Sequence, residues 1–487
     1  MRPSSYRANP PAPTRREALT VTKRGPLAVT RTLTWNRVGQ SVNRPLRRLL
    51  GHAALRCAAL ALALAALISW CGGALLTSYG RAKVERAFTA ANPGAALRIG
   101  KVNYWAGANR MVAQSVALSG ANTTLKAGRI SLAGVQWARL VWGTAGLADV
   151  LAQAGFEATD VELEFPATHY RLRCARLRGS VPRSELLAEG IELKSLLDES
   201  EFFAEHTFRA TRFHLVVPVC QVSGLAYAEL LQGKAVRART VAFSQPSFDA
   251  SVDCDRPVPP LVRSPLLPNE ALALLPIPLQ LDSLRIINGH LAYRERTAAG
   301  APPGLLTIAT VNMSVEGIAS QGDPPAAIRL QAQGELMGAG TLKVQMLMPL
   351  SARGLSLHYS GSLGGMDLTR LDAFLENAEH TRITSGTAKE ASFDIDVSEG
   401  RARGQVHGVY ENLQLAILDK QTGDEKGLAN RAASLLENTF KLRKSNPLEG
   451  SAEFKEGVVD YTRKPGDEFQ QFLWFALRTG VLDLIKR

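Results

Sequence analysis

The sequence predicts a mainly β protein with a few α-helices. We expect a single N-terminal transmembrane helix, then a long, curled antiparallel β-sheet that forms an apolar groove, capped by a C-terminal amphipathic helix. Three observations predict this class. A run of twenty uncharged residues lies near the N-terminus, period-two alternation dominates the remainder, and helical spacing is confined to a few segments.

The net charge of +13 is concentrated at the N-terminus. Residues 1–56 hold twelve Lys and Arg residues against a single acid, Glu17, a balance of +11 that leaves +2 for all following residues. A nearly neutral bulk argues against a basic nucleic-acid-binding protein, so no nucleic-acid partner is expected. The first 56 residues are rich in Pro, Arg, Ser and Thr without a sustained period, which predicts a disordered tail.

The uncharged run from Cys57 to Leu76 predicts a transmembrane helix over residues 57–79. A helix rises about 1.5 Å per residue, so twenty residues cover the roughly 30 Å hydrocarbon core. The run is longer than the roughly 7–15 residues of a signal-peptide apolar region, and no small-residue cleavage site precedes Arg81. Cations are denser before the run than after it, which places the tail in the cytoplasm and the bulk across the membrane.

Strict alternation of apolar and polar residues marks four segments, 328–336, 342–348, 355–363 and 393–397. Side chains on a strand point alternately to opposite faces, so each segment has one apolar and one polar face. Glycine-containing breaks such as 337–340 and 399–400 predict the turns between strands. The pattern is typical of an antiparallel meander with one wet and one dry face.

Shorter and less regular strand candidates precede this region. They cover residues 98–102, 111–118, 125–132, 135–140, 161–165, 170–177, 208–217, 236–243, 284–293 and 305–315. Residues 255–278 contain seven prolines, too many for ladder-forming strands. We therefore expect a linker at 255–278 between an N-terminal β-rich region, 80–254, and a C-terminal β-rich region, 279–487.

Four segments show helical spacing of apolar residues: 184–203, 367–379, 427–440 and the C-terminal segment that begins near Asp467. In the last, Asp467 and Gln470 resemble a capping box. Its expected apolar face consists of Phe469, Phe472, Leu473, Leu477 and Val481. Such a helix caps the sheet or contacts a membrane, a lipid or a partner protein.

Many one-faced strands with few helices leave an apolar surface that needs a cover. The sheet can close into a barrel, pair with a second sheet or curl into a groove. A groove leaves a large apolar surface whose natural occupant is another apolar molecule. The expected lining residues come from the most regular strands: Leu342, Val344, Met346, Leu357, Tyr359, Phe393, Ile395 and Val397.

No nucleotide, zinc-protease, dithiol or nucleophile-elbow motif occurs in the sequence. The eight histidines have no metal-like spacing, and His358 and His407 fall on polar strand faces. Glu201, Glu205 and His206 are the nearest approach to an acid–base cluster, but they fit a solvated helix face better. We expect no catalytic residues, no metal, no cofactor and no enzymatic activity.

Four stretches resemble AsmA-like proteins of the bacterial envelope. They are the N-terminal membrane helix before strand-rich sequence, the phrase 284–295 with its central Asn-Gly, the segment 385–404 followed by 410–419, and the end, 457–465 with 469–485. This resemblance implies an inner-membrane anchor and a periplasmic apolar β-groove open along one side. It also implies a role in lipid movement between the two membranes or in outer-membrane upkeep, and an AsmA-like C-terminal region at 279–487.

Two functions are therefore expected. The first is an anchored groove that binds or conducts phospholipid or another envelope lipid without catalysis. The second is an envelope assembly or scaffold protein whose β face is filled internally and whose C-terminal helix docks other envelope proteins.

Overall fold

The computed structural model describes residues 85–86, 89, 95–120, 123–136, 139, 146–257, 260, 265–298, 300–320, 327–350, 355–418 and 442–487. All of them belong to one compact unit, Arg37–Arg487. The predicted tail, the predicted transmembrane helix at 57–79 and the predicted helix at 427–440 lie outside the described residues. Within the described part of the chain, no helix is long and apolar enough to span a membrane.

The protein is mainly β, as predicted, and all eighteen described strands belong to one sheet. The first nine strands are β1 (Ala96–Trp105), β2 (Arg110–Gly120), β3 (Thr123–Ala133), β4 (Gly155–Phe165), β5 (Tyr170–Ser180), β6 (Glu185–Ser195), β7 (Thr211–Ser223), β8 (Val236–Ser244) and β9 (Ser247–Asp253). The other nine are β10 (Leu279–Arg296), β11 (Gly304–Ala319), β12 (Ala327–Leu336), β13 (Gly340–Pro349), β14 (Leu357–Leu363), β15 (Met366–Asp367), β16 (Thr381–Ser398), β17 (Arg401–Ile417) and β18 (Gly457–Thr462).

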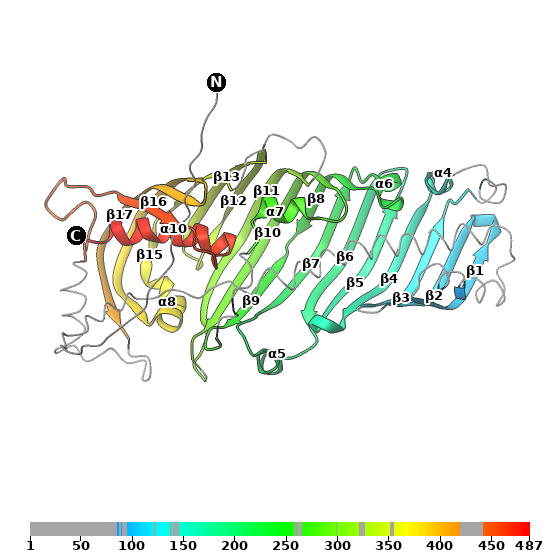
Figure 1. Cartoon of the computed structure of the whole chain (residues 1–487), viewed down its shortest axis with the longest axis horizontal. Coiled ribbons are helices and arrows are strands. Elements are labelled where there is room, and N and C mark those ends of the chain that lie inside the picture. Colours follow the sequence, from blue (N-terminus) through cyan, green and yellow to red (C-terminus); the bar gives the residue numbers. More distant parts are fainter. Residues whose placement is uncertain are drawn as a thin grey trace, which may run out of the picture. The chain divides into compact units, whose positions relative to one another are not determined.

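The sheet is mixed rather than purely antiparallel, which corrects the prediction. Consecutive strands form antiparallel pairs almost throughout, but β10 runs parallel to both β8 and β9. A strand that follows a long connection is free to enter the sheet in either direction, and the Pro-rich segment before β10 is such a connection. The sheet therefore continues without interruption across residues 255–278 (Figure 1).

Short helices accompany the sheet, with α5 at its lower margin and α4 and α6 at its upper margin, and one longer helix crosses its face (Figure 1). The short helices are α4 (Leu147–Leu151), α5 (Glu199–Glu205), α6 (Tyr227–Leu231), α7 (Pro268–Ala273) and α8 (Asp372–Glu379), the last preceded by the 3-10 turn η3 (Leu368–Leu371). Two further 3-10 turns are η1 (Ala106–Ala108) and η2 (Pro166–Thr168). The crossing helix is α10 (Phe469–Leu484), which packs on β17 and β18.

The C-terminal part of the sheet is curled. Helix α8 packs against β10, β11 and β16, although β12, β13 and β14 separate β11 from β16 in the sheet. The Thr297 hydroxyl at the end of β10 donates to the Asn377 carbonyl of α8 (2.8 Å). The Arg463 guanidinium after β18 donates to the Pro265 carbonyl before α7 (2.8 Å). These contacts require strands β10–β18 to bend around α8 and α10.

Strands β1–β7 share an irregularity at one level. The ladder of paired residues skips one position on each strand, or two between β3 and β4, and we call the line of positions skipped throughout the crease. It consists of Gly100, Ser115, Gly128, Asp160, Ala175, Gly190 and Pro218. Ser115, Asp160 and Gly190 have φ between 52° and 65°, which bends the strand. Pro218 has no N–H to offer to a ladder.

The crease explains why the N-terminal strands look irregular in the sequence. At the crease, two consecutive residues of each strand point to the outer face. The inward-facing apolar residues on either side of them are therefore three positions apart instead of two. In β6 the inward pair is Ala188 and Ile191, on either side of Glu189 and Gly190. That spacing imitates a helix, and the predicted helix at 184–203 was wrong for this reason. Residues Glu185–Ser195 form β6, and only Glu199–Glu205 are helical.

Two other sequence predictions need correction. Residues 135–140 hold no strand at their described positions, because Gly134 turns the chain (φ 74°) and Val135 enters the core instead. The strand predicted at 284–293 is confirmed within β10, although Asn288 (φ 52°) and Gly289 interrupt its pairing. The cap of α10 is Glu468, whose N–H donates to the Gln471 side chain (3.1 Å), one residue beyond the predicted pair.

The helix predicted at 367–379 is confirmed as η3 followed by α8. The turns predicted at 337–340 and 399–400 are also confirmed. Met337 and Gly338 have φ of 52° and 64°, and Glu399 and Gly400 have φ of 50° and 75°, values that suit the tight turns of hairpins.

Candidate functional site

One face of the sheet is apolar from β1 to β18. Paired residues on neighbouring strands point to the same face, so the register shows which side chains form a row. One such row runs Leu186, Val222, Val241, Leu284, Val315, Leu330, Met346, Tyr359 and Ile395. It passes from β8 to β10, so the apolar face continues across the Pro-rich linker. Leu186 through Met346 are half-buried, whereas Tyr359 and Ile395 are buried.

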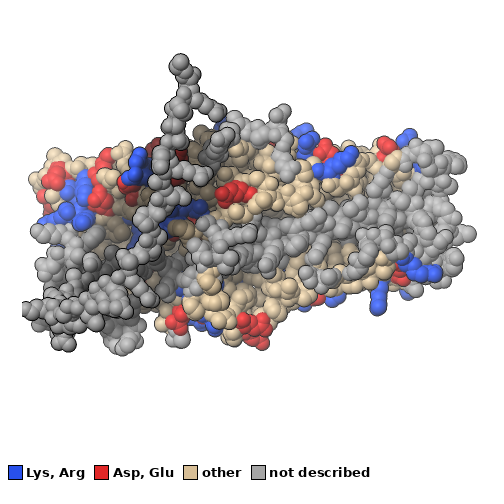
Figure 2. Space-filling view, viewed as in Figure 1, with Lys and Arg blue, Asp and Glu red and all other residues tan. Residues whose placement is uncertain are grey.

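The opposite face of the same strands is polar. Cross-strand ion pairs join Arg171 to Glu164 (3.2 Å) and Arg178 to Glu189 (3.0 Å). In Figure 2, which shows one side of the molecule, the described surface is mostly uncharged, and Lys, Arg, Asp and Glu gather chiefly at the left end and near the upper and lower margins. The two faces of the sheet thus differ in the polarity that the alternation predicts.

The eight predicted groove residues all lie on the apolar face, but they divide into two groups. Leu342, Val344, Met346 and Phe393 are half-buried. Leu357, Tyr359, Ile395 and Val397 are at most 3% exposed and belong to the core cluster that also contains Phe472, Ala476 and Leu484 of α10. The Tyr359 hydroxyl donates to the Leu473 carbonyl of α10 (3.0 Å). The second group is therefore covered by the chain's own helix.

The predicted apolar face of α10 is similarly divided. Phe472 is fully buried, and Phe469, Leu473 and Leu477 are half-buried at the edge of the same cluster. Val481 is 37% exposed and lies on the side away from the sheet, together with Trp474 and Leu482. Helix α10 is thus apolar on both sides.

Two glycines allow α10 to lie close to the sheet. A Cβ placed on Gly480 would lie 2.5 Å from a methyl of Val406 and 2.6 Å from one of Val459. A Cβ on Gly457 of β18 would meet the backbone of Gly480 itself. The absence of both side chains brings helix and sheet backbones together, and it fixes α10 over β17 and β18.

The middle of the apolar face has a different cover. At the lower margin, Phe202 and Phe203 of helix α5 pack against buried strand residues such as Tyr170 and Phe213. At the upper margin, Tyr227 of α6 packs against the sheet. Between them lies a cluster of strand residues alone: Ala188, Val217 and Cys220, with half-buried Cys174, Leu177, Ile191, Leu215, Val222, Val241 and Phe243. We call these ten residues the central cluster. Sequence reasoning missed it, because the crease hides its alternation.

A polar network of side chains from β10, α8 and α10 interrupts the apolar face. Glu295 is 5% exposed and accepts a hydrogen bond from the Tyr293 hydroxyl (3.0 Å). Burial raises the pKa of Glu295 and, together with the nearby Glu295 charge, raises the pKa of Glu379 to about 9. Burial lowers the pKa of Arg478 to about 10, and the Glu379 charge opposes that shift. The network joins three elements that are distant in sequence.

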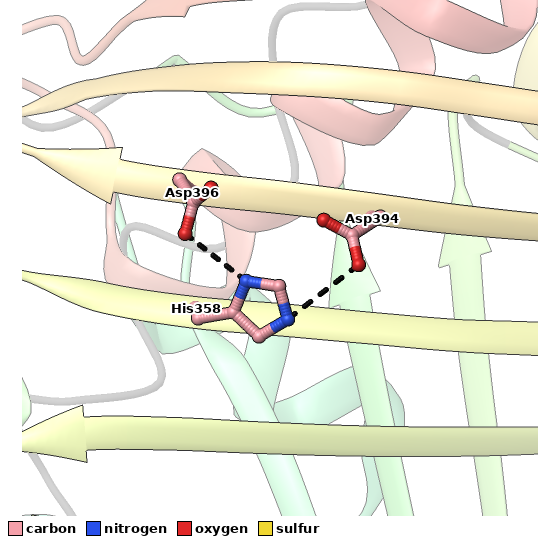
Figure 3. A group of neighbouring side chains, drawn as sticks. All are labelled: His358, Asp394 and Asp396. Atoms are coloured by element: carbon pink, nitrogen blue, oxygen red, sulfur yellow. Dashed lines mark hydrogen bonds and ion pairs between the residues drawn. The ribbon is translucent and has the colours of Figure 1, made fainter.

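His358, Asp394 and Asp396 lie together on the polar face (Figure 3). The two imidazole nitrogens face one carboxylate each, Nδ1 to Asp396 at 3.0 Å and Nε2 to Asp394 at 3.6 Å. All three side chains are well exposed. A ring on β14 that lies between two carboxylates of the neighbouring strand β16 is accounted for as a cross-strand polar contact.

The reduced cysteines give no sign of reactivity. Cys174, Cys220 and Cys254 are free thiols. Burial raises the pKa of each, and the pKa of Cys220 reaches about 11. A thiol with a raised pKa carries little of the nucleophilic thiolate at neutral pH. Cys220 acts as a small apolar side chain within the central cluster.

Comparison with known proteins finds no matching family model and no matching curated protein.

Proposed function

We propose that the chain binds or conducts lipid along the apolar face of its sheet, as an inner-membrane-anchored periplasmic protein of AsmA-like type. The observation that supports this proposal is the in-register row from Leu186 to Met346, which is half-buried and continuous across the linker. An acyl chain on such a row leaves water at a gain of about 0.8 kcal/mol per buried methylene. No catalytic group is needed for this function.

The anchor, its orientation and the role in envelope lipid homeostasis belong to the same proposal. They rest on the uncharged run at residues 57–76 and on the excess of cations before it. A single-pass anchor at the inner membrane would hold the sheet in the periplasm, where phospholipid is the available apolar ligand.

Native mass spectrometry of the purified full-length chain tests lipid binding. We expect phospholipid adducts on the wild type. Leu330→Glu, which places a carboxylate on the row, should remove most of them, because an unpaired charge is costly beside acyl chains. Gln331→Glu puts the same charge on the opposite face of β12 and should keep the adducts. The proposal would be contradicted if both variants kept their lipid adducts or if both variants lost them.

The scaffold alternative is favoured by one observation, the outward apolar side of α10. Trp474 is 47% exposed, and Leu482 is 37% exposed. Under this alternative, Trp474→Ser with Leu482→Ser abolishes co-purification of an envelope protein and leaves lipid adducts unchanged. Truncation of α10 would not be informative, since Phe472 and Ala476 are part of the core.

A further inference from the structure

The segment 265–278, which contains α7 and precedes β10, packs on the apolar face of the C-terminal strands. We call this segment the strap. Leu267 is 6% exposed and belongs to the same buried cluster as Phe472 of α10, and Leu272 packs against that cluster. Leu274, at the end of α7, is 64% exposed. The strap thus holds some of its leucines against the sheet and one away from it.

The strap joins the two ends of the curled region along one margin of the sheet. The register places the start of β10 and the end of β18 at the same margin, with β11–β17 between them. Beside β10, the Val236 N–H donates to the Pro278 carbonyl (2.8 Å). Just beyond β18, the Arg463 guanidinium donates to the Pro265 carbonyl (2.8 Å). The strap therefore crosses the curl from one end to the other.

The burial of the apolar face increases at the level of the strap. Leu330 and Met346 pair across β12 and β13 and are half-buried. Ile328 and Met348 pair across the same strands, one level nearer the margin, and are at most 9% exposed. This second pair lies in the buried cluster that contains Leu267. The chain thus covers the face at one level of these strands with a side chain of the strap.

The bonding of the strap suits a segment that lifts from the sheet intact. Its helical hydrogen bonds are internal, from the Ala271 N–H to the Leu267 carbonyl (2.8 Å) and from the Leu274 N–H to the Glu270 carbonyl (3.1 Å). Proline has no N–H to offer to a β-ladder. The strap contains four prolines: Pro265, Pro268, Pro276 and Pro278. It packs on the strands without becoming one of them, and α7 keeps its own bonds when it moves.

We propose that the strap is a displaceable cover, whose leucines occupy the place that a lipid acyl chain takes over β12 and β13. This inference rests on the proposed lipid function and deepens it, because it names the segment that the lipid displaces. Acyl methylenes and leucine side chains bury the same kind of apolar surface, so each can replace the other on Ile328 and Met348. The hydrogen bond from Arg463 to Pro265 holds the closed position.

Hydrogen exchange of the wild-type, full-length protein tests the displacement. Exchange is measured by mass spectrometry with and without phosphatidylcholine–phosphatidylglycerol vesicles, and native mass spectra of the same samples report lipid adducts. We expect about fivefold faster exchange of the α7 amides when lipid is bound, because the lifted strap loses its cover. The amides of α10 should exchange at an unchanged rate.

The two proposals fail in different ways. Lipid adducts accompanied by unchanged or slower exchange of α7 would overturn the strap inference and leave lipid binding intact. The absence of lipid adducts from the wild type would contradict the proposed function and the inference with it.

A matched pair of leucine variants provides a second test. Leu267→Ser weakens the hold of the strap on the sheet, whereas Leu274→Ser makes the same change at its exposed leucine. The apparent affinity for lipid follows the fraction of protein with the strap displaced. We expect about a threefold higher ratio of lipid-bound to free protein for Leu267→Ser and no change for Leu274→Ser. Equal ratios, with circular dichroism showing both variants folded, would overturn the inference.

Arg463→Ala tests the same point without a change in the buried cluster. It removes the hydrogen bond to the Pro265 carbonyl and should raise the lipid-bound ratio. Arg401→Ala is the control, since it removes an exposed ion pair with Asp460 of β18 and leaves the strap untouched. Equal lipid binding by these two variants would also overturn the inference.

Discussion

The apolar face of the sheet is covered differently at its C-terminal end and in its middle. Over β14, β16, β17 and β18 the face is covered by α10, and Ile395 and Phe472 are fully buried. Over β5–β8 the face is bordered by short helices, and the central cluster contains strand residues only. The comparison shows that apolar alternation alone does not identify a binding surface. Among the described residues, what distinguishes the two regions is whether a helix of the chain packs over the strands.

The largest expected effect contrasts two isoleucines of the apolar face. Ile395→Ala should lower the free energy of unfolding by roughly 2–5 kcal/mol, because it opens a cavity in a closed core. Ile286→Ala, at a half-buried position on β10, should cost about 1 kcal/mol. Urea denaturation of the full-length protein measures both. Equal losses would mean that the two regions are equally closed.

The next effect concerns the contact of α10 with the sheet. Gly480→Leu should destabilise the protein by about 1–3 kcal/mol, because the new side chain meets Val406 and Val459. It should also make α10 more susceptible to proteolysis. Val481→Leu, on the exposed side of the same helix, serves as the control and should leave stability unchanged. A stable Gly480→Leu variant would contradict the close packing of α10.

A smaller effect is expected from the hydrogen bond between the sheet and α10. Tyr359→Phe removes the donor to the Leu473 carbonyl and should cost about 1 kcal/mol in thermal or urea unfolding. Tyr104→Phe is the matched control, since that hydroxyl makes an exposed and longer hydrogen bond (3.3 Å). If both variants lose the same free energy of unfolding, the hydrogen bond to α10 contributes no more to stability than the exposed one.

A separate effect, on the pH profile, is expected from Glu379. The pKa of Glu379 is raised to about 9 in the folded state, against an ordinary value of 4.5. Between these values the folded state binds the extra proton, so the contribution of Glu379 to stability is full below about pH 4.5 and is lost as the pH rises toward 9. Glu379→Gln should flatten the fall of stability over this window. An unchanged pH profile would show that Glu379 does not couple to folding.

Much of the fold could be predicted from the sequence, and the failures have a common cause. Strands β12–β14 and β16 alternate strictly, and their turns contain residues suited to positive φ, so local pattern and final structure agree. In β6 the crease changes the spacing from two to three, and the pattern of Ala188 and Ile191 imitates a helix. The parallel placement of β10 depends on contacts between distant segments, which no local pattern contains.

The candidate site was predicted in part. Alternation correctly placed the eight expected residues on one face, from Leu342 to Val397. It could not show that α10 covers Leu357, Tyr359, Ile395 and Val397, because the position of a helix over a sheet depends on long-range packing such as that of Gly457 on Gly480. The central cluster went unpredicted for the reason that made β6 look helical. The polar network of Glu295, Glu379 and Arg478 joins residues up to 183 positions apart and has no sequence signature.

The most direct measurement of the difference between half-buried and covered parts of the apolar face compares two residues that are partners in the sheet. Met346 and Tyr359 pair across β13 and β14, but Met346 is half-buried and Tyr359 lies under α10. A diazirine-bearing amino acid is placed at either position of the full-length protein, which is then exposed to phosphatidylcholine–phosphatidylglycerol vesicles and irradiated. We predict lipid capture at position 346 and cross-links to α10 at position 359. Equal lipid capture at both positions, or capture at neither, would contradict the account.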